Sequence, residues 1–284
     1  MEGDNGINTP LTQELRLFGR YSTGTSSYGN CKARVRKLQF SNGTNIIRSY
    51  KPTVWHNSNT TAIATLYDEV YNKMCTPSGS LKAYIVGADD TVYEVGSNVS
   101  GTPDSVLGTS NCFDTGIYGN QDMQVKLISY LPSNASVTGQ LFGSYDGSET
   151  TSKNYTINTT HTSGTAAPIR FDGKVITTPI QKGNTKVTIV DNKSGIWVDN
   201  ALHGSWGNPS DFTTTTTLLI LKCNNSSNVR QNGCCYLLIE ENQIPIAEYI
   251  PVKNASVSSE YGLYDRVNGT LNTGIGTITF NALS

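Results

Sequence analysis

The chain has 284 residues, a formal net charge of −1 and a charged fraction of only 15%, against roughly 25% in an average globular protein. This balance excludes the broad positive field with which proteins attract nucleic acid or anionic membranes. No apolar run approaches the ~20 residues that a membrane-spanning helix needs. We therefore expect no nucleic-acid partner and no membrane insertion.

A series of sequence motifs near the start of the chain recurs in the same order near its end. The first copy reads Leu15-Arg16-Leu17-Phe18-Gly19, Cys31, Tyr50-Lys51-Pro52 and Leu66-Tyr67-Asp68-Glu69-Val70. The second reads Leu218-Leu219-Ile220-Leu221, Cys234, Tyr249-Ile250-Pro251 and Leu263-Tyr264-Asp265-Arg266-Val267. The shared order predicts one structural unit used twice. Because Asp68 recurs as Asp265, we expect a turn or hydrogen-bonding role for both, not catalysis.

Short β-type runs follow one another along the chain. Examples are residues 81–86, 124–128, 186–190 and 195–198, each bounded by Gly, Asn, Asp or Pro. Short strands separated by such turn residues are typical of all-β sandwiches and jelly rolls. The Gly- and Pro-containing segment from Ser97 to Thr109 predicts a domain boundary.

Beyond that boundary the sequence resembles a known family. The segments that carry the resemblance are F-D-T-G-I at 113–117, L-F-G at 141–143, the K-V-T-I and I-W-V-D runs within 186–199, and the closing segment 249–280. They are similar to the laminin-G-like, concanavalin-type jelly rolls of phage and gut-bacterial proteins, and the resemblance covers Val106 to Phe280. It implies an antiparallel β-sandwich (jelly roll) complete at 104–284. Residues 1–100 would then form a partial repeat, the C-terminal half of a jelly roll plus connecting strands. Such a half-domain would belong to a longer tandem protein, be completed by another subunit, or stand as a reduced sheet docked on the second domain.

The best candidate for a binding site is the loop 203–211, where Trp206 lies between glycines with His203, Asn208 and Asp211 nearby. An indole ring stacks well on the apolar face of a sugar, while amide and carboxylate groups bind its hydroxyls. In the alternative interpretation, Trp206 closes the end of the sandwich and the glycines shape the turn. Trp55 is the second aromatic candidate.

No catalytic or tightly bound metal site is predicted. A retaining glycosidase needs two carboxylates about 5.5 Å apart, and adjacent pairs such as Glu240-Glu241 point to opposite faces of a strand. The family resemblance implies calcium, for which turn carboxylates could supply ligands, but no loop concentrates them, so we expect at most a weak calcium site. The carboxylates considered are Asp114, Asp122, Asp146 and Asp172. The six cysteines lack zinc-type spacing, and we expect buried free thiols.

Together these features predict a non-enzymatic phage virion protein, a fibre or decoration component that adheres to host-surface glycans. Its other partners would be virion subunits, in a homo-oligomer such as a trimer. The opening residues 1–5 are acidic and polar, which is not typical of a signal peptide, and a virion released by lysis fits that feature. The alternatives are a purely structural subunit-assembly module and a secreted bacterial carbohydrate-binding module.

Overall fold

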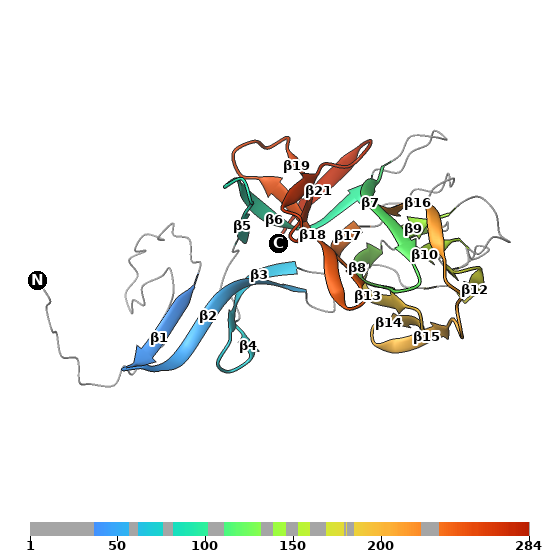
Figure 1. Cartoon of the computed structure of the whole chain (residues 1–284). Coiled ribbons are helices and arrows are strands. Elements are labelled where there is room, and N and C mark those ends of the chain that lie inside the picture. The colour runs from blue at the N-terminus through green and yellow to red at the C-terminus, as the bar shows by residue number, and fades with distance from the viewer. Residues whose placement is uncertain are drawn as a thin grey trace, which may run out of the picture.

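The chain is built from antiparallel β-strands (Figure 1). The computed structural model describes residues 37–56, 62–75, 82–101, 111–131, 139–145, 153–159, 169–178, 180, 185–222 and 233–283. Within these ranges there is no helix, and so none that could span a membrane. The predicted all-β class is confirmed.

The strands form three sheets. One has the order β1-β2-β3-β4: β1 (Leu38–Asn42), β2 (Asn45–His56), β3 (Ala62–Asp68) and β4 (Lys73–Met74). A six-stranded sheet has the order β12-β11-β10-β9-β16-β7: β12 (Lys174–Ile176), β11 (Ile169–Phe171), β10 (Tyr155–Thr159), β9 (Gly139–Ser144), β16 (Thr213–Ile220) and β7 (Phe113–Asn120).

The third sheet has 11 strands, nine of them in the order β15-β14-β13-β8-β17-β6-β18-β19-β20. These are β15 (Ala201–Ser205), β14 (Gly195–Val198), β13 (Thr185–Asn192), β8 (Met123–Leu131), β17 (Gly233–Glu241), β6 (Val92–Gly101), β18 (Ile244–Asn254), β19 (Tyr261–Asp265) and β20 (Thr270–Asn272). The remaining two, β5 (Tyr84–Val86) and β21 (Ile278–Ala282), pair with β6. Thus β5 and β6, from the segment 1–100, join a sheet of later strands, and the division between 100 and 104 stays a prediction.

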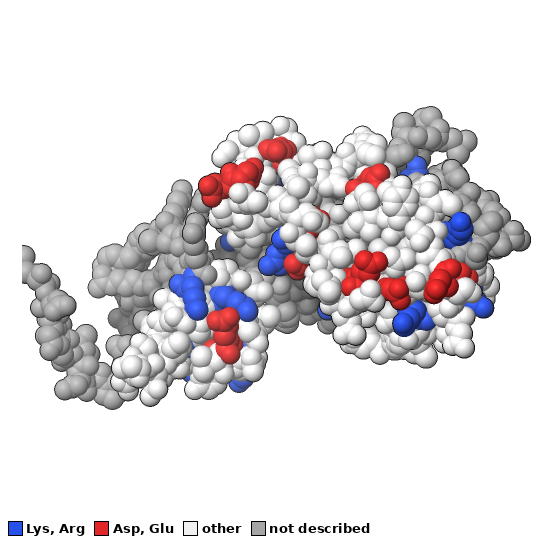
Figure 2. All heavy atoms as spheres, viewed as in Figure 1, with Lys and Arg blue, Asp and Glu red and all other residues white. Residues whose placement is uncertain are grey.

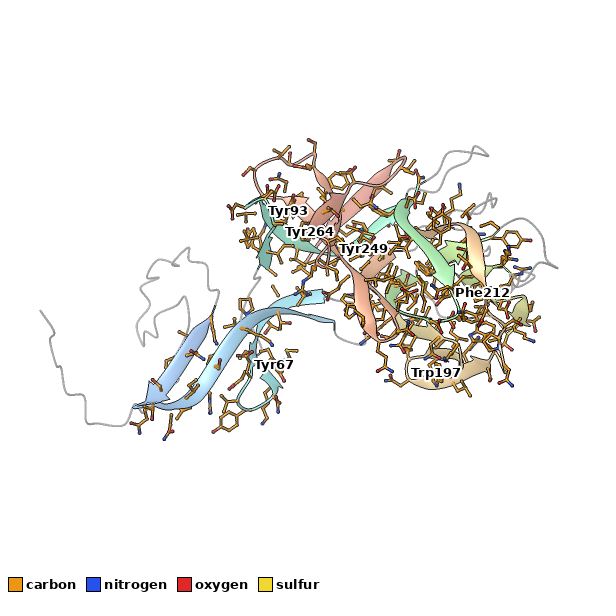
Figure 3. The ribbon with its side chains drawn as sticks, in the orientation of Figure 1. Tyr67, Tyr93, Trp197, Phe212, Tyr249 and Tyr264 are labelled. Atoms are coloured by element: carbon orange, nitrogen blue, oxygen red, sulfur yellow. The ribbon has the colours of Figure 1, made fainter. Side chains whose placement is uncertain are left out.

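The 6-stranded and 11-stranded sheets face each other as a β-sandwich around one core. Strand β8 shows how the sequence builds it, because its alternate residues Met123, Val125, Leu127 and Leu131 are buried while those between are more exposed. One cluster joins buried residues of both sheets; those from the six-stranded sheet are Phe113, Leu141, Phe142, Tyr155, Ile157, Ile169, Phe171, Leu218 and Ile220. Figure 3 shows labelled Phe212 and Tyr249 within this sandwich and Tyr67 on the separate β1–β4 sheet.

The pairing of residues within strands β1–β4 matches the pairing within strands β17–β20. In the first set Tyr50 lies opposite Asp68 and Pro52 opposite Leu66. In the second set Tyr249 lies opposite Asp265 and Pro251 opposite Leu263. The strand register shifts at the corresponding point in the first hairpin of each set. The shift lies between Phe40 and Ser41 in β1 and between Ile239 and Glu240 in β17. The motifs that recur in the sequence therefore occupy corresponding positions in these two four-stranded runs.

The aspartates of the two Leu-Tyr-Asp motifs organise equivalent turns. Oδ1 of Asp68 accepts hydrogen bonds from the backbone N–H groups of Val70 (3.0 Å) and Tyr71 (3.3 Å). Oδ1 of Asp265 accepts the corresponding bonds from Val267 (3.0 Å) and Asn268 (3.3 Å). A carboxylate that accepts backbone bonds two and three residues ahead fixes a turn. The predicted turn role of both aspartates is confirmed.

The cysteines behave as small apolar residues. Cys112, Cys234 and Cys235 are buried and free, and Cys75 is free and half-buried. Burial raises the pKa of the Cys235 thiol to about 12 and that of Cys234 further, which keeps both protonated and unreactive. The prediction of buried free thiols is confirmed for Cys112, Cys234 and Cys235, whereas Cys31 and Cys223 lie outside the described residues.

Asp265→Ala should destabilise the sandwich by about 2–3 kcal/mol, because a buried carboxylate that accepts several hydrogen bonds is lost and its donors stay unpaired. Besides the two turn amides, Asp265 accepts bonds from the Glu248 backbone N–H and from the Asn268 amide. Urea unfolding followed by tryptophan fluorescence measures the change. Asp265→Asn is the matched control, since it keeps one acceptor oxygen and should lose less; an equal loss in both variants would contradict the turn role.

Candidate functional site

The loop 206–212, between β15 and β16, closes one end of the sandwich. Its backbone N–H groups donate to three different turns. That of Trp206 donates to the Ser194 carbonyl (3.4 Å), that of Phe212 to Oε1 of Gln121 (3.0 Å), and that of Ser210 to Oδ2 of Asp172. These turns join β13 to β14, β7 to β8 and β11 to β12. A loop held at three points has one defined shape, which is the condition for a preorganised surface.

Trp206 anchors this loop in the core. Its side chain is only 3% exposed, and its ring stacks on Phe171 with centroids 5.6 Å apart and planes at 17°. Its indole N–H donates to Oδ1 of Asp191 (2.8 Å). Phe171 also contacts Tyr155 and Phe212 edge-on. The hypothesis that Trp206 stacks on a sugar is therefore corrected: the side chain closes the end of the sandwich, because its apolar area and its indole N–H are both satisfied inside.

Asp191 is a fully buried carboxyl group beside this aromatic cluster. Its Oδ1 accepts the Trp206 bond, whereas its Oδ2 has no hydrogen-bond partner among the described residues. Burial raises the pKa of Asp191 well above its ordinary value, although the Trp206 hydrogen bond acts in the opposite direction. Burial, and then the nearby charge of Asp191, raise the pKa of Tyr155, whose buried hydroxyl is also unpaired among the described residues. The core at this end thus favours neutral forms of both groups.

The outer side of the loop is polar and accessible. Asn208, Ser210 and Asp211 are exposed. His203, from β15, is half-buried, and its Nε2 lies 2.8 Å from the carbonyl oxygen of Thr178. Figure 2 shows scattered charged groups on an otherwise uncharged visible face, in keeping with the low charged fraction. Of the four residues predicted on this loop, Asn208 and Asp211 remain available to a ligand, His203 in part.

Trp55 belongs to a different sheet. Its backbone lies in β2, opposite Ile63 of β3, and its side chain lies outside the described residues. The strand that carries Trp55 therefore belongs to a different sheet from the strands that flank the 206–212 loop.

The carboxylates near turns are engaged separately. Asp114 accepts a bond from the Gly116 N–H, Asp122 lies 4.0 Å from the Lys193 ammonium, and Asp172 holds the loop through Ser210. In the part of the chain that the structure describes, no three His, Cys, Asp or Glu side chains come together as a cation site requires. Asp146 lies outside that part.

Three residues that shape the loop were not predicted in this role: Gln121, Asp191, and Asp172, which was considered only as a possible calcium ligand. The sequence did hold a signal for Asp191. In β13 the alternation Val187, Ile189, Asp191 places the carboxylate on the same face as two fully buried residues. An aspartate at an inward position of a strand requires a buried donor. Gln121 and Asp172 stand in ordinary turns, and only the fold brings them to the loop.

Comparison with protein-family models, curated proteins and solved structures finds no match to this chain. The geometry of the loop and the sheets is therefore the basis for any inference about function.

Asp191→Asn should stabilise the protein, and the gain should grow with pH. Because the folded-state pKa of Asp191 is raised, its stabilising contribution is complete below the unfolded pKa of about 3.9 and is lost as pH rises toward the folded value. The amide keeps an acceptor for the Trp206 indole but carries no charge. We expect the free energy of unfolding of Asp191→Asn to exceed that of the wild type near pH 7, and the difference to shrink toward pH 4.

Urea unfolding at several pH values between 4 and 8 measures this gain. Asp211→Asn, which changes an exposed aspartate of the same loop, should leave the pH dependence of stability unchanged. The assignment would be refuted if the stability of the wild type rose relative to that of Asp191→Asn between pH 4 and 7.

Proposed function

We propose that this chain is a non-enzymatic phage virion protein, a fibre or decoration component, that adheres to host-surface glycans through the 206–212 loop. Its sandwich would be a laminin-G-like jelly roll, and β1–β4 a partial repeat of the same fold. The observation that carries the proposal is that this loop, anchored at three turns and by Trp206, turns Asn208, Ser210 and Asp211 outward.

Side chains of this kind suit sugar hydroxyls. An amide offers both donors and acceptors, a carboxylate offers acceptors, and a serine hydroxyl offers either. A rigid loop lowers the entropy lost when a ligand binds. With Trp206 inside the core, the loop has no ring of its own to stack on a sugar, so each site would bind weakly. Adhesion would then depend on several copies acting together in a homo-oligomer.

A purely structural role is the second candidate, and the half-buried apolar side chains of β1 and β2 favour it. The corresponding residues in β17–β20 are covered by the six-stranded sheet, whereas in β1–β4 Leu38, Phe40 and Tyr50 are only half-buried. A sheet of this kind suits assembly with other subunits of a virion. The further alternative is a secreted bacterial carbohydrate-binding module. It is tested by the same measurement of glycan binding.

Asn208→Ala combined with Asp211→Ala should weaken saturable binding to glycans. The measurement presents the purified chain at high surface density to an array of bacterial capsular polysaccharides and oligosaccharides. We expect about a five- to thirtyfold loss of apparent affinity, because one or two hydrogen bonds are worth about 1–2 kcal/mol in total. Thr215→Ala, at an exposed position of β16, is the matched control and should bind as wild type.

The possible results separate the candidates. Binding that survives the double substitution moves the site to another surface, with the neighbourhood of Trp55 tested next by Trp55→Ala. A chain that binds no glycan even at high density supports the structural role instead.

A further inference from the structure

The outer edge of β1 pairs with no other described strand, whereas the corresponding edge of β17 is paired. Strand β17, which corresponds to β1 in register, pairs with β18 and the end of β6 on one side and with β8 on the other. Within the described ranges β1 pairs with β2 alone and ends its sheet. A strand edge of this kind presents free N–H and C=O groups to another strand.

The sequence of β1 lacks the features that protect edges. Residues Leu38 to Asn42 include no charged side chain and no proline. By contrast, the strand at the opposite edge, β4, has two exposed residues, one of them Lys73. Short length and lysine are common protections of an edge strand. Of the two edge strands described in this sheet, β1 is therefore the one without these protections.

An apolar strip extends along the same side of the sheet. Leu38 and Phe40 alternate with exposed residues in β1, and the Phe40 ring contacts Tyr50 edge-on, with centroids 6.2 Å apart. All three are half-buried, whereas the corresponding Leu237, Ile239 and Tyr249 are at most 4% exposed. In the sandwich, Leu237 and Ile239 meet Leu127 and Val125 of β8 across the strand pair. The strip on β1 would gain burial from a strand placed like β8.

We propose that β1 pairs with β1 of a second copy of this chain. The two strands would run antiparallel about a twofold axis and join two four-stranded sheets into one continuous sheet. The pairing β17–β8 is itself antiparallel, so the twofold arrangement reproduces the local geometry already used in the sandwich. An antiparallel pair of identical strands is self-complementary, as an isologous interface must be.

A second copy fits this edge better than a further six-stranded sheet does. At the position of the fully buried Ala247, the β1–β4 sheet has Arg48, whose Nε lies 3.4 Å from Oδ2 of Asp68 and whose guanidinium lies 3.7 Å from the Tyr71 ring centroid. A covering sheet would have to desolvate this charge. Pairing along the edge of β1 leaves it in water, and the uncharged β1 creates no repulsion between copies.

With the register centred on Phe40, the two Phe40 rings would lie opposite each other on the same face. Aromatic cross-strand pairs stabilise antiparallel sheets. This interface does not include the 206–212 loop, because β1 lies in a different sheet from β15 and β16. The dimer can therefore be tested separately from glycan binding, and the proposed adhesion would gain from it.

Phe40→Lys tests the interface by placing two ammonium groups opposite each other. Sedimentation velocity of the full chain across a range of concentrations should show a reversible wild-type dimer. The variant should dissociate at least about tenfold more readily, because like charges directly opposite in a strand pair are unfavourable. Leu202→Lys is the matched control: Leu202 is 60% exposed in β15, the edge strand of the 11-stranded sheet, and the change should leave the dimer intact.

Hydrogen–deuterium exchange of wild-type protein provides a readout without substitution. The amides of Leu38 to Asn42 should exchange more slowly at concentrations where the dimer forms, and those of β15 should not change. A monomer at every concentration would overturn the proposal, as would a dimer unaffected by Phe40→Lys. Protection of β1 that is independent of concentration would also overturn it, because the edge would then be covered within one chain.

Discussion

A β-sheet with one apolar face is stable in water only when that face is covered, and this requirement accounts for the arrangement of the molecule. Polar groups and charges are scarce on the inward positions of β8, β13, β17 and β18, so these strands need a second layer. The six-stranded sheet supplies it, and buried residues from both sheets form one cluster. The end of the sandwich needs a cover as well, and Trp206 with its loop provides it.

The cover at that end includes a polar group that cannot reach water. The indole N–H of Trp206 must be paired once the ring is buried, and Asp191 pairs it. A carboxylate in that position loses its hydration, which raises its pKa. The same contact that closes the core thus gives the protein a titratable group inside it and holds the outward polar side chains of the loop in place.

The two four-stranded runs show how one local pattern serves two environments. Their hydrogen-bond registers and their Asp-anchored turns correspond. The difference lies at inward positions, where Arg48 stands in place of Ala247 and the residues of β1 are half-buried. Local sequence therefore forms the strands and turns in both cases, whereas the surroundings decide whether the resulting sheet is a core layer or an open surface.

The sequence by itself determined the all-β class, the repeated motifs, the turn role of Asp68 and Asp265, and the free state of the described buried cysteines. Each depends on neighbours in the chain or on residue type, which local patterns record. Only the tertiary structure decided that Trp206 is buried while Asn208 and Asp211 face solvent, because the stacking partner Phe171 and the acceptor Asp191 come from other strands. It also decided that β6 joins the later strands, since strand order depends on hydrogen bonds between distant segments that no local pattern specifies.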